Sequence, residues 1–205
     1  MIFSELAKKR RSVHSFIPNK EFTDAQFKEL IKTTSYTPSG YNAQPWEFVL
    51  IRDKDRLKKL QEIAYNQKHI TECSGVIVIL GDTNIGRNAD ELLKDWVKYG
   101  YCTEEQVPVY KNTFTKKRAP EKLKDMSLRN ATLSAMTLMY AAEEMGLATC
   151  PMMGITQWEL MDFIKAPEDR ILIMAIAIGY EDTGKEKPQL PRKKIENMIH
   201  FEEFS

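Results

Sequence analysis

The sequence lacks several features that mark broad classes of protein. It has three cysteines among 205 residues, Cys73, Cys102 and Cys150, which form no CxxC pair and leave an odd count. No histidine lies near them at metal-ligand spacing, so we expect free buried thiols and no metal site. The first residues do not resemble a cleavable signal, and no run approaches the roughly 18 apolar residues of a membrane span. These absences predict a cytoplasmic protein without a membrane segment.

An excess of one charge is also missing. Thirty basic residues face 29 acidic ones, for a net charge of +1. A nucleic-acid-binding domain usually carries a clear basic surplus, so that class of partner is not expected. The sequence also contains no GxGxxG loop, acid–base dyad or nucleophile–His–Asp arrangement. Side-chain acid–base or nucleophilic catalysis is therefore not indicated.

Three apolar segments predict strands of one α+β domain. Trp46–Ile51 is rich in bulky and branched residues, and follows a turn-forming stretch. The runs at residues 76–80 and 171–178 are short and rich in isoleucine, which is typical of central strands covered on both faces. Helices and strands do not alternate strictly along the chain, so the pattern favours an α+β fold over a doubly wound sheet.

Two helices and one irregular segment stand out elsewhere in the chain. Thr23, with Gln26 three residues later, forms a capping box that predicts a helix start. Residues 128–145 are apolar around most of the helical circumference, which indicates burial in the core or in a subunit interface. Residues 88–124 are polar, aromatic and rich in charge, with a weak helical pattern at residues 89–99, and we interpret them as a helical excursion that covers another part of the molecule.

A basic cluster follows the expected short helix Phe3–Lys9. Arg10, Arg11 and Ser12 continue it, and arginine forks with a hydroxyl are suited to binding a phosphate. Taken alone, the cluster favours a solvated charge run, because cations are stabilised at a helix C-terminus in any case. A second, proline-bounded basic cluster at residues 192–194 would complete a phosphate site or form a solvated tail.

Two other segments have compositions that suit a bound ligand. Residues 38–46, PSGYNAQPW, are rich in small and amide side chains, and Gly40 permits close approach of the backbone to a flat ligand. Residues 150–156, CPMMGIT, precede a helix with an apparent capping box of Thr156 and Glu159, where free backbone N–H groups are available. The first segment also fits an ordinary loop, and the second a helix start with methionines packed in the core.

Together and in this order, the four segments resemble the nitroreductase family of flavoproteins. The match covers nearly the whole chain, is most specific at PSGYNAQPWEF and is weakest between residues 84 and 124. The resemblance implies a single FMN-binding domain over residues 1–205, with a mostly antiparallel sheet flanked by helices. It also implies an intertwined homodimer, in which the helix at 128–145 lies in the interface and an arm at 188–205 extends over the partner.

The resemblance also assigns candidate cofactor-binding residues. For the FMN phosphate and ribityl chain they are Arg10, Arg11, Ser12 and Arg192. The partner subunit is expected to contribute a further group that lies against the edge of the flavin ring: Pro38, Ser39, Gly40 and Asn42. Around the ring of the same subunit they are Asn66, Met153 and Gly154, with His14 near N1 and O2.

At two of these positions the chain departs from the family pattern. Met153 stands where several members carry a glutamate, so a carboxylate that places the acceptor or the nicotinamide is absent here. His14 stands where members often carry lysine or arginine. A histidine is only partly charged at neutral pH, so the charge near N1 is expected to be weaker.

The implied activity places the chemistry on the cofactor rather than on a catalytic side chain. NADH or NADPH binds transiently and reduces FMN, and nitroaromatics, quinones or similar flat acceptors reoxidise it in a ping-pong sequence. One alternative is specialised flavin chemistry such as dehalogenation, azoline oxidation or flavin breakdown, with residues 88–124 as a substrate lid. Another is a flavin-binding protein without turnover.

Overall fold

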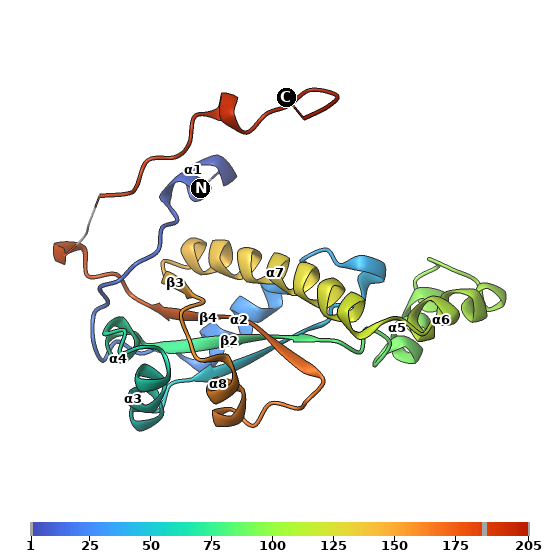
Figure 1. Cartoon of the computed structure of the whole chain (residues 1–205), viewed down its shortest axis with the longest axis horizontal. Helices are drawn as coiled ribbons and strands as arrows, with labels where there is room; N and C mark the ends of the chain where they lie inside the picture. Colours follow the sequence, from blue (N-terminus) through green and yellow to red (C-terminus); the bar gives the residue numbers. More distant parts are fainter. Residues whose placement is uncertain (1, 186–187, 205) are drawn as a thin grey trace.

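A four-stranded antiparallel sheet is the centre of the computed structural model, which describes residues 2–185 and 188–204 (Figure 1). Its strand order is β1–β2–β4–β3. The bounds are β1 Trp46–Ile51, β2 Gly75–Asp82, β3 Ala148–Met152 and β4 Arg170–Gly179. All eight residues of β2 are buried, and β2 lies between β1 and β4. The three predicted strands are thus confirmed, with the two isoleucine-rich ones at the centre.

The edge strand β3 was not predicted. It contains Pro151, which has no N–H to donate, and proline is tolerated in edge strands for that reason. Residues 150–156 were expected only to lead into a helix. The helix α8, Gln157–Phe163, does begin after Thr156, but the Thr156 side chain caps no backbone N–H. The predicted capping box is therefore wrong, although the helix start is right.

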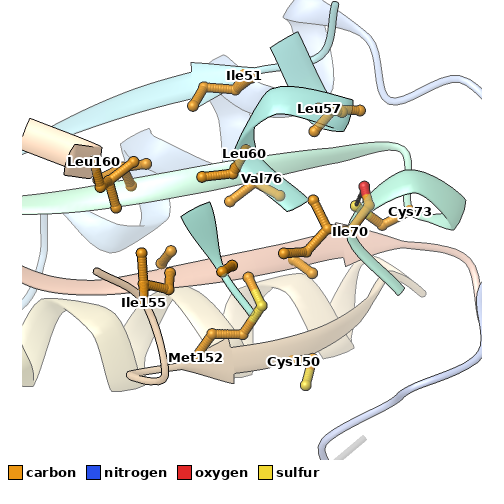
Figure 2. Close-up of a cluster of buried hydrophobic side chains, with 14 of the residues drawn as sticks. Ile51, Leu57, Leu60, Ile70, Cys73, Val76, Cys150, Met152, Ile155 and Leu160 are labelled. Carbon is orange, nitrogen blue, oxygen red and sulfur yellow. Dashed lines mark hydrogen bonds between the residues drawn. The ribbon is translucent and has the colours of Figure 1, made fainter. Parts of the chain in front are cut away.

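Helices cover both faces of the sheet. On one face α7, Pro120–Glu144, packs with α2, Asp24–Thr34, over a core that includes Leu30 and Leu138. On the other face, α3, α4 and α8 enclose the core shown in Figure 2. The bounds of the first two are α3 Lys54–Ile63 and α4 His69–Glu72. The capping box of Thr23 and Gln26 at the start of α2 is confirmed.

The long helix α7 begins at Pro120, ahead of the predicted start at residue 128. Its first turns are polar, so the apolar pattern does not extend over them. It ends at Glu144, and Gly146 follows with φ +74°, a left-handed conformation that glycine adopts without strain. Leu128 and Leu133 are 47% and 49% exposed, so the all-round apolar pattern of this helix exceeds what one chain buries.

Residues 88–119 form the excursion, which projects from one end of the sheet (Figure 1). It contains α5, Ala89–Lys98, and α6, Val107–Thr115, so the predicted helix in this region is confirmed. Leu93, Trp96 and Phe114 form the centre of a small apolar cluster separate from the two main cores. Because α7 starts at Pro120, the excursion ends at residue 119 rather than at 124.

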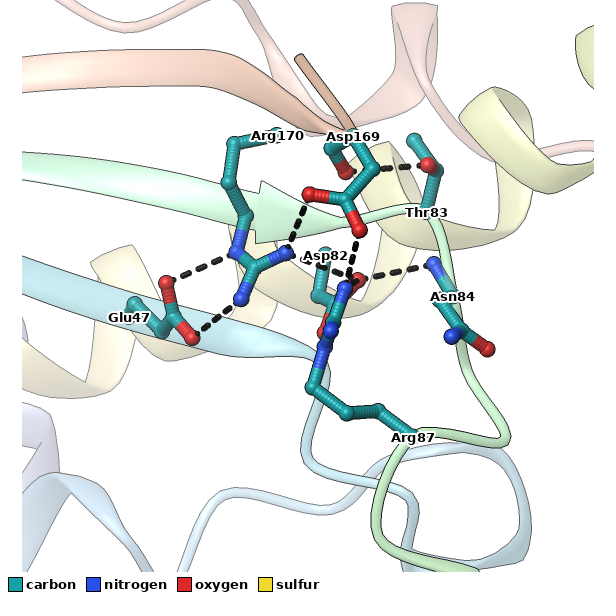
Figure 3. Close-up of polar contacts among 7 residues, drawn as sticks. All are labelled: Glu47, Asp82, Thr83, Asn84, Arg87, Asp169 and Arg170. Atoms are coloured by element: carbon teal, nitrogen blue, oxygen red, sulfur yellow. Dashed lines mark hydrogen bonds and ion pairs between the residues drawn. The ribbon is translucent and has the colours of Figure 1, made fainter. Parts of the chain in front are cut away.

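A charged network fixes the base of the excursion to the sheet (Figure 3). Asp82 of β2 and Arg170 of β4 are paired in register, and both are buried. The Arg170 guanidinium donates to both carboxylate oxygens of Glu47 at 2.7 Å. Arg87, which directly precedes the excursion, donates to the carboxylates of Asp82 and Asp169. The chain thus leaves the sheet at a position set by charge-assisted hydrogen bonds.

The two ends of the chain lie side by side, away from the sheet (Figure 1). The short helix α1, Phe3–Lys9, is confirmed as predicted. The Gln189 side chain donates to the backbone carbonyls of Lys8 and Lys9, at 3.0 and 3.2 Å. Residues 188–204 otherwise form an extended arm whose apolar side chains are exposed, including Phe201 at 83% and Phe204 at 91%. Among the described residues, none of the helices is long and apolar enough to cross a bilayer.

Candidate functional site

Three segments far apart in the sequence meet at one end of the sheet, and we call them the three-segment cluster: residues 10–14, 65–69 and 149–154. The first docks against the third, because Ser12 forms a parallel β-bridge with Thr149. The Val13 N–H donates to the Thr149 carbonyl at 3.0 Å. The basic segment after α1 is therefore extended and held beside β3.

The second segment docks against the end of the third. Tyr65 and Asn66 both have left-handed backbones, with φ of +53° and +59°, so the chain turns sharply after α3. Asparagine adopts this conformation more readily than most residues. The Gln67 side chain then donates to the Gly154 carbonyl at 3.0 Å. This turn places Asn66 next to the segment that contains Met153 and Gly154.

Two histidines and two sulfur side chains lie inside the three-segment cluster. His14 Nδ1 is 3.7 Å from Cys150 Sγ, and the rings of His14 and His69 are 5.2 Å apart, edge to face. His69 Nε2 lies 3.0 Å from Met152 Sδ. Burial, together with the neighbouring His14, lowers the pKa of His69 to about 4, so its imidazole is neutral at physiological pH.

The predicted phosphate-binding arginines lie around this cluster in different settings. Arg10 is half-buried at the end of α1 and is close enough to Cys150 to affect its titration. Arg11 Nε is 3.8 Å from Glu181 Oε1. Arg192 lies in the exposed arm and donates to the Leu190 carbonyl at 2.9 Å. Within one chain Arg10 and Ser12 therefore belong to the cluster, and none of the described contacts joins Arg192 to it.

The predicted edge residues Pro38, Ser39, Gly40 and Asn42, which we call the edge loop, lie elsewhere. The Gly40 N–H donates to Asn130 Oδ1 of α7 at 2.8 Å. At the other end of α7, Glu143 pairs with Lys9 at 2.9 Å, next to the three-segment cluster. The helical rise between positions 130 and 143 amounts to about 20 Å. A single chain therefore does not bring the edge loop and the cluster together.

Glycines in both places have room around them that the chain itself does not use. A Cβ on Gly154 would meet only Gln67 Nε2 at 3.8 Å and Tyr65 Cδ2 at 4.0 Å, and one on Gly40 only Asn130 Oδ1 at 3.8 Å. Neither glycine has a positive φ. By contrast, a Cβ on Gly81 would lie 2.3 Å from Ser127 Oγ, so packing alone requires that glycine. The open space above Gly40 and Gly154 fits a flat group that approaches the backbone closely.

A cavity of about 690 Å³ lies between the edge loop and the excursion. Aromatic side chains form much of its wall, and they come mainly from the excursion. The lining residues are Ser39, Tyr41, Asn42, Gln44, Leu92, Asp95, Trp96, Tyr99, Tyr101 and Tyr110. A cavity with aromatic walls and a few polar groups is suited to flat organic molecules.

Sequence reasoning missed two residues that hold these groups in place. Gln67 supports the Gly154 carbonyl, and Asn130 fixes the Gly40 backbone. Asn130 is a polar residue inside an otherwise apolar helical stretch, and that position was a signal for a specific contact. Gln67 offered no comparable signal, because an amide in a turn is common.

Comparisons with known proteins agree on one family. The model of the "Nitroreductase family" matches residues 7–180. The chain is 27% identical to "Putative NAD(P)H nitroreductase MhqN" of Bacillus subtilis (strain 168) over 207 residues, 97% of this chain and 98% of that protein. It is similar to the crystal structure of "putative nitroreductase ydfN" from Bacillus subtilis, with a TM-score of 0.92, 26% identity and coverage of 97% and 98%. For a "putative nitroreductase in complex with FMN" from Exiguobacterium sibiricum 255-15, the TM-score is 0.85, identity 25%, and coverage 98% and 97%.

Proposed function

The chain belongs to the nitroreductase family, and on that basis we propose that it is an FMN-dependent oxidoreductase that takes electrons from NADH or NADPH. The observation that carries this proposal is the three-segment cluster, in which Ser12 is bridged to Thr149 at the start of β3 and Gln67 binds the carbonyl of the open Gly154 just beyond its end. Such an arrangement offers cations and a hydroxyl to a phosphate, and the open backbone at Gly154 to an aromatic ring.

The residues of the cluster fit FMN as follows. We place the phosphate and ribityl chain at Arg10, Arg11 and Ser12, since guanidinium forks match phosphate oxygens. We place the ring over Gly154, where a Cβ would occupy the available space. His14 and Asn66 then offer imidazole and amide groups to the polar edge of the ring. When bound, FMN supplies the hydride-accepting and electron-donating chemistry that no side chain provides.

We further propose that the active form is a homodimer and that the edge loop belongs to the partner's site. The separation of the edge loop and the cluster along α7 supports this, because each chain holds one part of the site at each end. The exposed Leu128 and Leu133, together with the apolar arm, provide the surface that a second copy would bury. Arg192 of the arm then reaches a phosphate only after the arm packs onto a neighbouring chain.

The substrates that we propose are flat acceptors such as nitroaromatics and quinones, reduced in a ping-pong sequence. The aromatic cavity beside the edge loop supports this choice. Met153 is 82% exposed and carries no charge, so a hydride donor and an acceptor can use the same uncharged surface in turn. The use of a reduced nicotinamide fits a cytoplasmic enzyme, because that donor pool is intracellular.

Anaerobic stopped-flow absorbance of the purified FMN-loaded protein tests this proposal. Mixing with NADH or NADPH is expected to bleach the flavin band rapidly, and a nitroaromatic or quinone is expected to restore it. A yellow protein that neither donor bleaches would contradict the oxidoreductase proposal and favour a flavin-binding protein without turnover. Reduction without recovery by these acceptors would favour a specialised substrate instead.

A further inference from the structure

The contacts among His14, His69 and Cys150 are not explained by flavin binding alone. One nitrogen of each histidine and the Cys150 sulfur all lie within 4.8 Å of one another. The residues come from three separate elements: the segment after α1, the start of α4 and strand β3. Sequence spacing gave no sign of this group, because Cys150 and His14 are 136 positions apart in the chain.

We propose that His14, His69 and Cys150 form a binding site for a borderline or soft transition-metal ion such as Zn²⁺. Imidazole and thiolate are the ligands that such ions prefer, and three protein ligands with one open position are a known zinc arrangement. Zinc bonds of about 2.0 Å to nitrogen and about 2.3 Å to sulfur place neighbouring N and S ligands about 3.5 Å apart. The observed 3.7 Å between His14 Nδ1 and Cys150 Sγ is close to that separation.

The backbone places a fourth candidate ligand at the same point. Cys150 and Met152 are two positions apart on β3, and residues at that spacing lie on the same face of a strand. Met152 Sδ lies 3.0 Å from His69 Nε2. A thioether is a weak hydrogen-bond acceptor but a good ligand of soft metal ions. Two imidazoles and a thiol therefore lie within 4.8 Å of one another, and a thioether contacts one of the imidazoles.

Metal binding changes the protonation of these ligands, because a metal ion binds the deprotonated forms of imidazole nitrogen and thiol. Each histidine would bind through a nitrogen lone pair. At Cys150, Zn²⁺ would form a zinc–thiolate bond, and the thiol proton would leave to solvent.

An ion can reach the site from one side without displacing the core. His69 and Cys150 are buried at 5% and 2% exposure, whereas His14 is exposed, so an entering ion would meet His14 first. The cluster has to contract by about 1 Å to reach zinc ligand distances. His14 uses Nδ1 toward Cys150, so its Nε2 stays available to a group bound in the flavin pocket.

Metal uptake by the full chain, purified with its flavin, tests the proposal. The protein is incubated with Zn²⁺ or Mg²⁺, freed of excess ion by desalting, and analysed for bound metal by mass spectrometry. We expect one Zn²⁺ per chain and no retained Mg²⁺, because Mg²⁺ prefers oxygen ligands. Co²⁺ in place of Zn²⁺ is expected to give thiolate charge-transfer absorption and the intense visible bands of four-coordinate cobalt.

Matched variants assign the ligands. Cys150→Ser and His69→Gln are each expected to lower zinc affinity by at least about tenfold, and Cys150→Ser is expected to abolish the charge-transfer band. The controls are Cys102→Ser, a second buried thiol, and His200→Gln, the third histidine of the chain. Both controls are expected to retain one Zn²⁺. Thermal melting of every variant separates loss of ligands from loss of the fold.

Two results would overturn the metal site. One is the absence of retained Zn²⁺ in the folded wild type, both with flavin and after flavin removal. The other is equal zinc retention by wild type, Cys150→Ser and His69→Gln, which would place the ion elsewhere. Flavin content and its reduction by NAD(P)H are measured on the same samples, so failure of the proposed function is recorded separately.

Discussion

The three-segment cluster and the edge loop differ in how much of the proposed site a single chain brings together. The cluster is complete within one chain, because backbone and side-chain contacts join residues 10–14, 65–69 and 149–154 directly. The edge loop lies about 20 Å away along α7 and faces the excursion and its aromatic cavity. In the dimer that we propose, folding of one chain assembles the cofactor-binding half of a site, and the second copy supplies the edge loop.

The largest expected effect comes from preventing that second copy from docking. The double variant Leu128→Lys and Leu133→Lys places two charges on the exposed apolar face of α7. Burying unpaired charges costs several kcal/mol, so we expect monomers and an FMN affinity lower by more than about 100-fold. Light scattering and flavin absorbance measure both effects.

The matched control for this variant is Val109→Lys, which changes an exposed apolar residue of the excursion instead. It is expected to remain dimeric and yellow. A monomeric double variant with full FMN affinity would show that one chain binds the cofactor without the edge loop of a second copy.

A smaller effect is expected from Arg10→Ala, which acts on the three-segment cluster alone. Loss of a charge-assisted hydrogen bond to phosphate costs about 1.5–3 kcal/mol, so FMN affinity should fall about 10- to 100-fold. The dimer should persist. Titration of the flavin-free protein with FMN measures the change, with Lys8→Ala, a neighbouring exposed cation, as the control. Equal affinities for the two variants would remove Arg10 from the phosphate site.

A third variant is expected to change acceptor binding without changing cofactor binding. Trp96 lines the cavity and contacts Tyr101 and Tyr110 edge to face, with ring centroids 4.8 and 5.2 Å apart. Trp96→Phe keeps an aromatic ring in the core but makes the cavity wall smaller. The KM for a quinone should therefore rise about tenfold, which is the range expected when one apolar contact is altered. FMN affinity and the rate of reduction by NAD(P)H should not change. A change in FMN affinity alone would place this wall outside the acceptor site.

The smallest expected effect is on the pH dependence of stability, through the charged network at the base of the excursion. A hydrogen bond from Arg87 holds the pKa of Asp169 below its ordinary value, and the nearby Arg170 acts in the same direction. The carboxylate therefore stabilises the fold above its unfolded pKa of about 3.9, and this stabilisation is lost as pH falls through the lower folded pKa. Melting temperatures between pH 6 and 3 should fall more steeply for wild type than for Asp169→Asn. Parallel curves would show that this contact contributes nothing to stability.

The sequence was informative where local pattern decides the structure. Apolar periodicity and capping residues predict three of the strands and three of the helices: β1, β2, β4, α1, α2 and α5. Strand β3 was missed because it is short and contains Pro151. The start of α7 was missed because the apolar pattern begins only at Leu128, while the polar first turns are stabilised by packing of the whole helix.

For the site, the sequence identified segments but not their assembly. Composition pointed to residues 10–12, 38–46, 150–156 and 192–194, and the resemblance chose individual residues within them and added Asn66 and His14. The sequence showed neither that His14 contacts Cys150 nor that the edge loop binds α7 at Asn130, about 20 Å from the cluster. Both facts depend on how distant segments pack, and local composition does not encode that directly.

The central claim is that each site is built from two copies of the chain. A purified heterodimer tests this claim most directly. One subunit carries Arg10→Ala with Ser12→Ala, and the other carries Gly40→Phe, for which the isolated chain has room. If the site is shared, the heterodimer has one intact site, so we predict about one FMN per dimer that NAD(P)H reduces, while both parent homodimers lose their flavin. A heterodimer as empty as its parents would contradict the account, because it would place both groups of residues in the same chain's site.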